Sequence, residues 1–216
     1  MKRRTNLALA GATVLAAGMM AATPVQAATC TSPDDCPTIV TFTLTGGDLT
    51  ITVPAGPINF TTFTNSPYRY AYGQILTTTP TIEVNDDRAA PAPDAAWTAT
   101  VTNPTGFVTP PPPGAPTYTI PNTDVYYHSG SATFGPVSNG TGTFSPGQSG
   151  AFVPPTSATA PPPAGTSQIG AAGATAFART GTASGSSAVG WDPYLVVYTN
   201  GAIAGSYQGE IDHSVA

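Results

Sequence analysis

Residues 97–102 read WTATVT, and this stretch predicts the class of fold. Trp97, Ala99 and Val101 share one face of an extended chain, because successive side chains of a β-strand point to opposite faces. Three threonines share the other face. Such alternation is typical of a strand with one buried side. The stretch therefore predicts a half-buried strand that places Trp97 in the core.

Stretches on both sides repeat this pattern. Residues 81–85 (TIEVN) alternate in the same way, and residues 38–53 (TIVTFTLTGGDLTITV) contain two alternating runs joined by Gly46 and Gly47. We interpret the second stretch as a β-hairpin with one apolar face. Residues 194–198 (YLVVY) are apolar on both faces, which predicts a central strand that is covered on both sides.

The C-terminal stretch 205–216 (GSYQGEIDHSVA) also alternates, with Tyr207, Ile211, His213 and Val215 on one face. It contains the residue types of a hydrolase triad in consecutive positions. Neighbouring strand residues point to opposite faces, so the imidazole cannot contact either adjacent side chain. We expect His213 to pack between Ile211 and Val215, hydrogen-bonded and neutral, since burial disfavours the charged imidazole.

Proline-rich insertions lie at about 104–121 and 154–165. Proline cannot donate to a sheet ladder, so these segments are expected to be extended loops or edge segments. Recognition sites of polyproline type are one interpretation, and export-tolerant surface loops are the favoured one. Together these patterns predict an all-β protein, in which residues 38–216 form a single antiparallel β-sandwich-like domain with long Pro/Gly-rich loops.

Residues 1–27 predict a cleavable helical signal peptide. Lys2, Arg3 and Arg4 precede an apolar run, and Val25-Gln26-Ala27 gives a small-residue cleavage pattern. The run is short for a membrane span, and no later run reaches that length, so we expect no membrane span after leader removal. The ordinary secretory route is favoured over twin-arginine export.

Residues 28–37 follow the leader and contain both cysteines of the chain, Cys30 and Cys36. In an exported protein this pair predicts a disulfide that closes a short N-terminal loop. Zinc binding is the rival interpretation, and it is disfavoured because no histidine lies nearby to complete a tetrahedral shell.

The charge balance excludes several partners. Of six basic and eleven acidic residues, three basic ones lie in the leader, so the mature net charge is 3 − 11 = −8. Nucleic acid and anionic lipid are therefore poor partners. The mature chain contains no lysine, which excludes Schiff-base chemistry and lysine isopeptide cross-links. The sequence shows no sorting signal, so we expect no covalent anchor to the wall.

Candidate catalytic and metal groups are few. Glu83 and Glu210 are the only glutamates and would be a glycosidase pair if they converged, but both fall on the polar faces of predicted strands. Residues 85–88 (NDDR) lack the spacing of an EF-hand loop, and an Asp–Arg pair that ends a strand is the favoured interpretation. His128 and Ser129 have no identifiable orienting acid. We therefore expect no catalytic residues, no metal and no cofactor.

The remaining candidates for binding are aromatic. Trp191, in GWDPYL, either covers one end of the core or lies at a surface groove, where an indole ring can stack on a sugar. Together with Trp97, Tyr207 and His213, it forms the set of candidate residues for binding the cell wall or a partner protein.

Three stretches together resemble the WxL domain of Gram-positive surface proteins, and most closely the WxL-like secreted proteins of actinobacteria. They are TFTLTGGDLTITVPAG, then IEVNDDR leading into WTATV, and YLVVYTNGAIAGSYQGEIDHSVA. The resemblance covers roughly 38–102 and 174–216. The family places a Trp-x-Leu motif on each of two strands. Here Trp97-Thr98-Ala99 and His213-Ser214-Val215 fall at those positions.

The resemblance implies a secreted protein that attaches non-covalently to the cell wall. Its partners would be peptidoglycan or another wall component, with a membrane-anchored WxL-interacting surface protein as a further partner. We therefore expect a non-enzymatic cell-surface protein. The alternative is a secreted hydrolase that acts on wall glycan or peptide, with acidic residues assembled in loops.

Overall fold

A computed structural model describes residues 42–43, 45–54, 64–65, 69–75, 82–109, 116–155 and 163–216. Residues 42–43 apart, these belong to one compact unit, Leu44–Ala216. The predicted leader and the two cysteines lie outside the described residues. The described ranges contain sixteen strands and one short 3₁₀ helix. These elements are β1 (Leu49–Thr52), β2 (Thr64–Asn65), β3 (Tyr70–Gln74), β4 (Ile82–Asp86), β5 (Trp97–Thr102), β6 (Phe107–Val108), β7 (Thr119–Ile120), η1 (Asn122–Asp124), β8 (Val125–His128), β9 (Ala132–Ser138), β10 (Thr143–Pro146), β11 (Ser167–Gln168), β12 (Ala174–Thr180), β13 (Ser187–Trp191), β14 (Tyr194–Tyr198), β15 (Gln208–Gly209) and β16 (Asp212–Val215).

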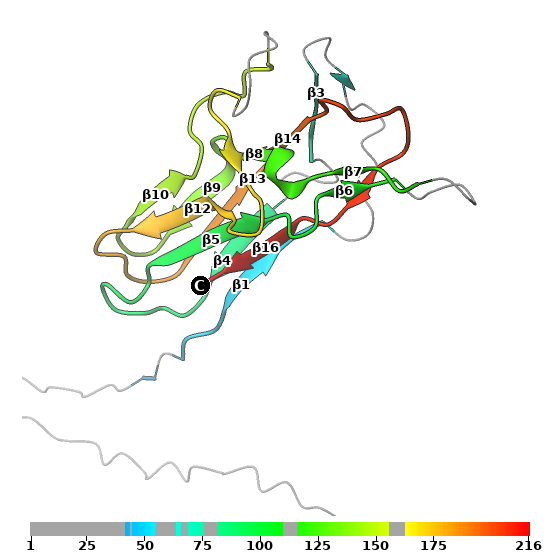
Figure 1. Ribbon diagram of the computed structural model, residues 1–216. Helices are drawn as coiled ribbons and strands as arrows, with labels where there is room; N and C mark the ends of the chain where they lie inside the picture. The colour runs from blue at the N-terminus through cyan, green and yellow to red at the C-terminus, as the bar shows by residue number, and fades with distance from the viewer. Residues whose placement is uncertain are drawn as a thin grey trace, which may run out of the picture. The chain divides into compact units, whose positions relative to one another are not determined.

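The strands form four antiparallel sheets (Figure 1). The first sheet has the order β1-β4-β13-β9, and the second has the order β10-β12-β5-β16. The third sheet has the order β11-β8-β14-β3-β2, and the fourth has the order β15-β6-β7. The predicted all-β, antiparallel, sandwich-like fold is confirmed.

The first and second sheets share one hydrophobic core. Val84 of β4 and Trp191 of β13 join Val101 of β5 and Phe177 of β12 in a single buried cluster. The rings of Phe177 and Trp191 stack with their centroids 5.1 Å apart. The burial of β5 alternates residue by residue, so Trp97 lies in the core as its alternation predicted.

The third sheet continues the first one across a bend. β14 follows β13 after Asp192 and Pro193, and β9 follows β8 after residues 129–131. The order β3-β14-β8 in the third sheet therefore matches the order β4-β13-β9 in the first. Pro193 has no N–H for the ladder, but its carbonyl accepts a hydrogen bond of 2.8 Å from the Ile75 amide. Beyond the bend, Leu195 still packs in the common core.

The predicted hairpin over 38–53 is confirmed only in its second strand. That strand is β1, and it pairs with β4. Residues 42–43 are not in a strand, and most of the predicted first strand lies outside the described residues. Gly46 and Gly47 allow a close approach to the end of β4: the Gly47 amide donates to the Asp87 carbonyl at 2.7 Å, and a Cβ at Gly46 would overlap the Arg88 carbonyl oxygen.

The described ends of the first proline-rich insertion form a short two-stranded pair, β6 with β7. The second insertion lies partly outside the described residues, and its described ends contain no strand. The predicted C-terminal strand consists of two strands, β15 and β16. In the part of the chain that the structure describes, no helix has the length and apolar character needed to cross a membrane.

Candidate functional site

Both tryptophans lie inside the protein. Trp97 is 2% exposed and Trp191 is fully buried. The indole of Trp97 packs edge-on against Phe144, and its N–H donates to the Ser187 hydroxyl at 3.5 Å. Both rings are buried, so Trp191 lies in the core and not at a surface groove.

His213 packs as its sequence pattern predicted. It lies on β16, which pairs with β5 in a register that places it beside Val101. Its Nε2 lies 3.3 Å from the Tyr127 hydroxyl, and the two rings meet edge-on. The same hydroxyl accepts a 2.9 Å hydrogen bond from Trp191 Nε1. Burial lowers the pKa of His213 from 6.5 to about 4, so the imidazole is neutral at physiological pH.

The structure therefore links two of the four predicted binding residues, Trp191 and His213, through a buried tyrosine. Trp97 lies on the strand next to His213, since β5 and β16 are neighbours in the second sheet. Tyr207 has a different partner: its hydroxyl donates to the Ile203 carbonyl at 2.9 Å. The contacts of Trp97, Trp191 and His213 lie in or against the core, whereas the hydrogen bond of Tyr207 is local to residues 203–207.

The two glutamates do not share a strand: Glu83 lies on β4, and Glu210 lies between β15 and β16. His128 places Nδ1 2.7 Å from the Gly165 carbonyl oxygen and Nε2 3.3 Å from the Gly150 carbonyl oxygen. It therefore ties two loops together. Among the described residues, no three histidine, cysteine or acidic side chains gather as a metal site.

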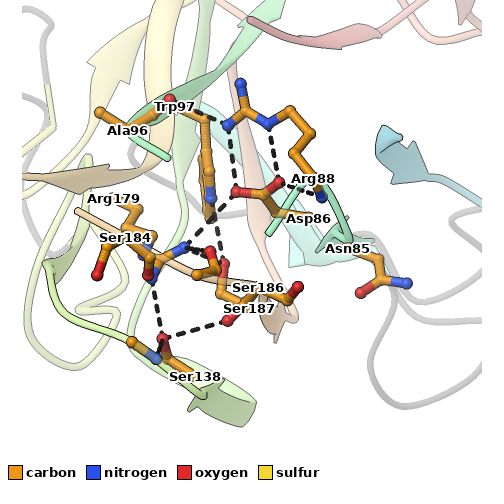
Figure 2. A network of polar contacts seen from close by, with 12 residues as sticks. Asn85, Asp86, Arg88, Ala96, Trp97, Ser138, Arg179, Ser184, Ser186 and Ser187 are labelled. Carbon is orange, nitrogen blue, oxygen red and sulfur yellow. Dashed lines mark hydrogen bonds and ion pairs between the residues drawn. The ribbon is translucent and has the colours of Figure 1, made fainter. Parts of the chain in front are cut away.

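A buried polar network occupies the space between the first and second sheets (Figure 2). Asp86, at the end of β4, is fully buried and receives a bidentate pair from Arg88, with N–O distances of 2.8 and 3.1 Å. The strand-ending Asp–Arg pair predicted for residues 85–88 is thus confirmed. Arg179 approaches the second oxygen of Asp86 at 3.6 Å.

Arg179 is itself fully buried on β12, and its guanidinium is surrounded by acceptors. It donates to Ser138 Oγ (2.9 Å), Ser187 Oγ (3.0 Å) and the carbonyls of Thr141 (2.8 Å), Gly185 (2.9 Å) and Ser184. Its Nε has no acceptor among the described residues, and its Cζ lies 5.5 Å from the centre of the Phe144 ring. Burial lowers the pKa of Arg179. The network joins side chains of the first and second sheets and thereby holds the two sheets in register.

The outer face of the third sheet differs from every other surface described so far. Tyr70 and Tyr72 lie two positions apart in β3, and Tyr194 and Tyr198 lie four apart in β14; strand geometry places residues at such even spacings on one face. The register then sets Tyr198 opposite Tyr70, and Val196 between Tyr72 and Tyr126. We call this surface the tyrosine face. It consists of Tyr70, Tyr72, Tyr126, Tyr194 and Tyr198, with Phe152 from the loop after β10.

The aromatic rings of this face are ordered against one another. Phe152 stacks on Tyr194, with ring centroids 4.2 Å apart and planes 10° from parallel. The Phe152 ring also lies 5.7 Å from Tyr72 and 5.6 Å from His128. Tyr70 and Tyr198 lie 5.0 Å apart. Offset and tilted rings at these separations stabilise one another, so the surface is preformed.

Part of the tyrosine face is open to solvent. Tyr70 and Tyr126 are buried, whereas Tyr72, Tyr194 and Tyr198 are partly exposed. Burial, with the charge of Asp124 nearby, raises the pKa of Tyr126 to about 12. Its hydroxyl is therefore a hydrogen-bond donor at physiological pH, and it donates to the Thr123 carbonyl at 3.1 Å.

No protein-family model, curated protein or solved structure matches this chain. The fold and the surface together define a β-sandwich-like protein that buries its tryptophans and the Asp86–Arg179 pair and has partly exposed tyrosines on one face of its third sheet.

Proposed function

We propose that the protein is a secreted, non-enzymatic cell-surface protein that associates non-covalently with the cell wall. The tyrosine face carries this proposal. Partly exposed rings with parallel and tilted neighbours form a preformed stacking platform, and stacking on aromatic rings is how an uncharged sugar ring gains contact area without an ion pair. The occupant of this face is a glycan strand of the wall.

The negative charge of the protein favours an uncharged stretch of wall polymer over an anionic one as the ligand. The mature chain carries a net charge of −8, and two of its three arginines, Arg88 and Arg179, are committed to Asp86. The acidic residue beside the platform, Asp124, would repel phosphate groups. Binding through ring stacking and tyrosine hydroxyls needs no cation, and moderate salt should leave it intact.

Co-sedimentation with purified Gram-positive walls tests the proposal. The mature protein should pellet with walls stripped of protein, resist moderate salt and be released by denaturant. The Tyr72→Ala/Tyr194→Ala double variant should stay soluble. Tyr118→Ala is the matched control, because Tyr118 is 40% exposed and lies outside the third sheet.

Three results would count against the proposal. Equal pelleting of the double variant and the wild type would remove the tyrosine face from wall binding. A wild-type protein that stays soluble with stripped walls but pellets with protein-bearing walls would replace the glycan by a protein partner. Soluble sugar or peptide released from the walls by the wild type would favour the hydrolase alternative.

A further inference from the structure

The sequence contains two Asn-Gly pairs, Asn139-Gly140 and Asn200-Gly201. The two pairs differ in the structure in their hydrogen bonds and in the space around them. We propose that Asn200 is a site of spontaneous deamidation, and that Arg69 promotes the reaction. The product would be an aspartate or isoaspartate beside the tyrosine face.

Deamidation meets the least steric hindrance when glycine follows asparagine, because glycine has no Cβ to obstruct its own amide nitrogen. The Gly201 nitrogen attacks Cγ of Asn200, and the new N–Cγ bond closes a succinimide. The Cγ–Nδ2 bond breaks, and Nδ2 leaves as ammonia with the proton that the Gly201 amide gives up through solvent. Water then opens the ring at either carbonyl, which gives aspartate or isoaspartate.

The turn at Asn200 leaves room for this chemistry. The Ala202 amide donates to the Thr199 carbonyl at 3.0 Å, so Asn200 and Gly201 occupy the centre of an exposed turn. Gly201 has a φ of +81°, and a Cβ added there would meet no atom within 4 Å. The Gly201 amide donates no hydrogen bond to any residue that the structure describes. Its nitrogen is therefore available for attack.

Arg69 activates the amide that is attacked. Its NH1 donates to Asn200 Oδ1 at 2.6 Å. Negative charge develops on that oxygen when nitrogen adds to Cγ, and a guanidinium already aimed at it stabilises the intermediate. The Thr199 amide donates to the Arg69 carbonyl at 2.7 Å, which keeps the two loops together. In the product, the same guanidinium would face a carboxylate.

The other pair is locked by its surroundings. Asn139 Oδ1 accepts a 2.7 Å hydrogen bond from the Ser186 amide, and the Gly140 amide donates to Ser138 Oγ at 3.1 Å. A Cβ on Gly140 would overlap the Ser184 carbonyl, so the backbone there is pressed against a neighbouring loop. The Gly140 nitrogen already donates a hydrogen bond, and the close contact with Ser184 restricts its movement toward Cγ of Asn139.

The consequence of the modification falls at the end of the tyrosine face. Asn200 lies two residues after Tyr198, which pairs with Tyr70 next to Arg69. Deamidation adds a negative charge there, and isoaspartate also lengthens the backbone of the turn. Aged protein would therefore differ from new protein at this edge.

Tryptic mapping of the aged mature protein tests the proposal directly. Cleavage after the arginines separates the two pairs, since Asn139 falls in 89–179 and Asn200 in 180–216. After incubation at mildly alkaline pH, the second peptide should show the amide-to-carboxylate mass change and isoaspartate severalfold faster than the first. Asn200→Gln should abolish the change in that peptide. Conversion of Asn139 at an equal or higher rate would overturn the assignment.

The contribution of Arg69 has its own measurement. Arg69→Ala should slow conversion of Asn200 severalfold, and Arg69→Lys, which keeps a cationic donor, should slow it less. Asn139 in the same samples serves as the internal reference. Unchanged or faster conversion of Asn200 in Arg69→Ala would show that the guanidinium does not promote the reaction.

Discussion

Around Asp86, both carboxylate oxygens and most donors of two guanidinium groups face partners from the same chain. On the tyrosine face, several rings keep part of their surface in solvent and pack against one another. The first region uses its polar groups to fix two sheets in register. The second leaves aromatic surface available. Stability and recognition are therefore separable, and mutations should affect them separately.

The largest effect is expected from Asp86→Ala. It leaves the Arg179 guanidinium buried without its counter-charge, which should lower the free energy of unfolding by about 3–5 kcal/mol. Chemical denaturation monitored by tryptophan fluorescence measures this. The matched control is Asp87→Ala, because Asp87 is the exposed neighbour on the same loop and its removal should cost no more than about 0.5 kcal/mol. Similar losses in the two variants would contradict a special role for the network.

Acid should produce the next largest effect, through His213. A histidine with a lowered pKa in the folded state binds fewer protons than the unfolded chain. Its stabilising contribution is complete above pH 6.5 and is lost as the pH falls toward about 4, with a total of at most about 3 kcal/mol. His213→Leu should fold and should lack this part of the pH profile. An identical profile in both proteins would refute the burial of a neutral imidazole.

Tyr127→Phe should have an intermediate effect. It removes the hydroxyl that accepts from Trp191 Nε1, and the orphaned indole N–H should cost about 1–3 kcal/mol. Tyr126→Phe, one residue away on the opposite face, removes a hydroxyl that donates to the carbonyl of Thr123 in a part-buried hydrogen bond, and we expect a smaller loss. Thermal unfolding of the pair compares the core with the tyrosine face directly.

The smallest effect on stability is expected at Tyr194. Tyr194→Phe keeps the stack on Phe152 and should change stability by no more than about 0.5 kcal/mol. If stacking carries wall binding, Tyr194→Phe should still pellet with walls, whereas Tyr194→Ala should not. Loss of binding in both variants would assign the interaction to the hydroxyl instead.

Local alternation predicted the core strands because each buries one face and exposes the other. Residues 97–102 and 194–198 are examples, and the structure has strands at both. β9 gave no such signal: it is exposed along nearly all of its length and contains Gly135 and Pro136. A strand at the edge of a sheet needs no apolar face, so periodicity alone does not find it.

The candidate site was less predictable, since it depends on pairs of residues far apart in sequence. The Asp86–Arg88 contact spans two residues and was anticipated, but Arg179 reaches Asp86 only because the first and second sheets pack together. The tyrosine face needs the register of β3, β8 and β14, which no local pattern specifies. The even spacing of the tyrosines within β3 and within β14 was the available signal, and it indicates a shared surface only when the strand order is known.

The bend at Pro193 has a consequence for how the molecule opens. Two separate ladders meet there, and a proline without an amide proton marks the boundary, so hydrogen exchange could be expected to report two cooperative units. Yet side chains from both sides of the bend, such as Trp191 and Leu195, pack into one hydrophobic cluster. Neither ladder can come apart without exposing the interior of the other. The slowest amides of the first and third sheets should therefore exchange together, as a single unit.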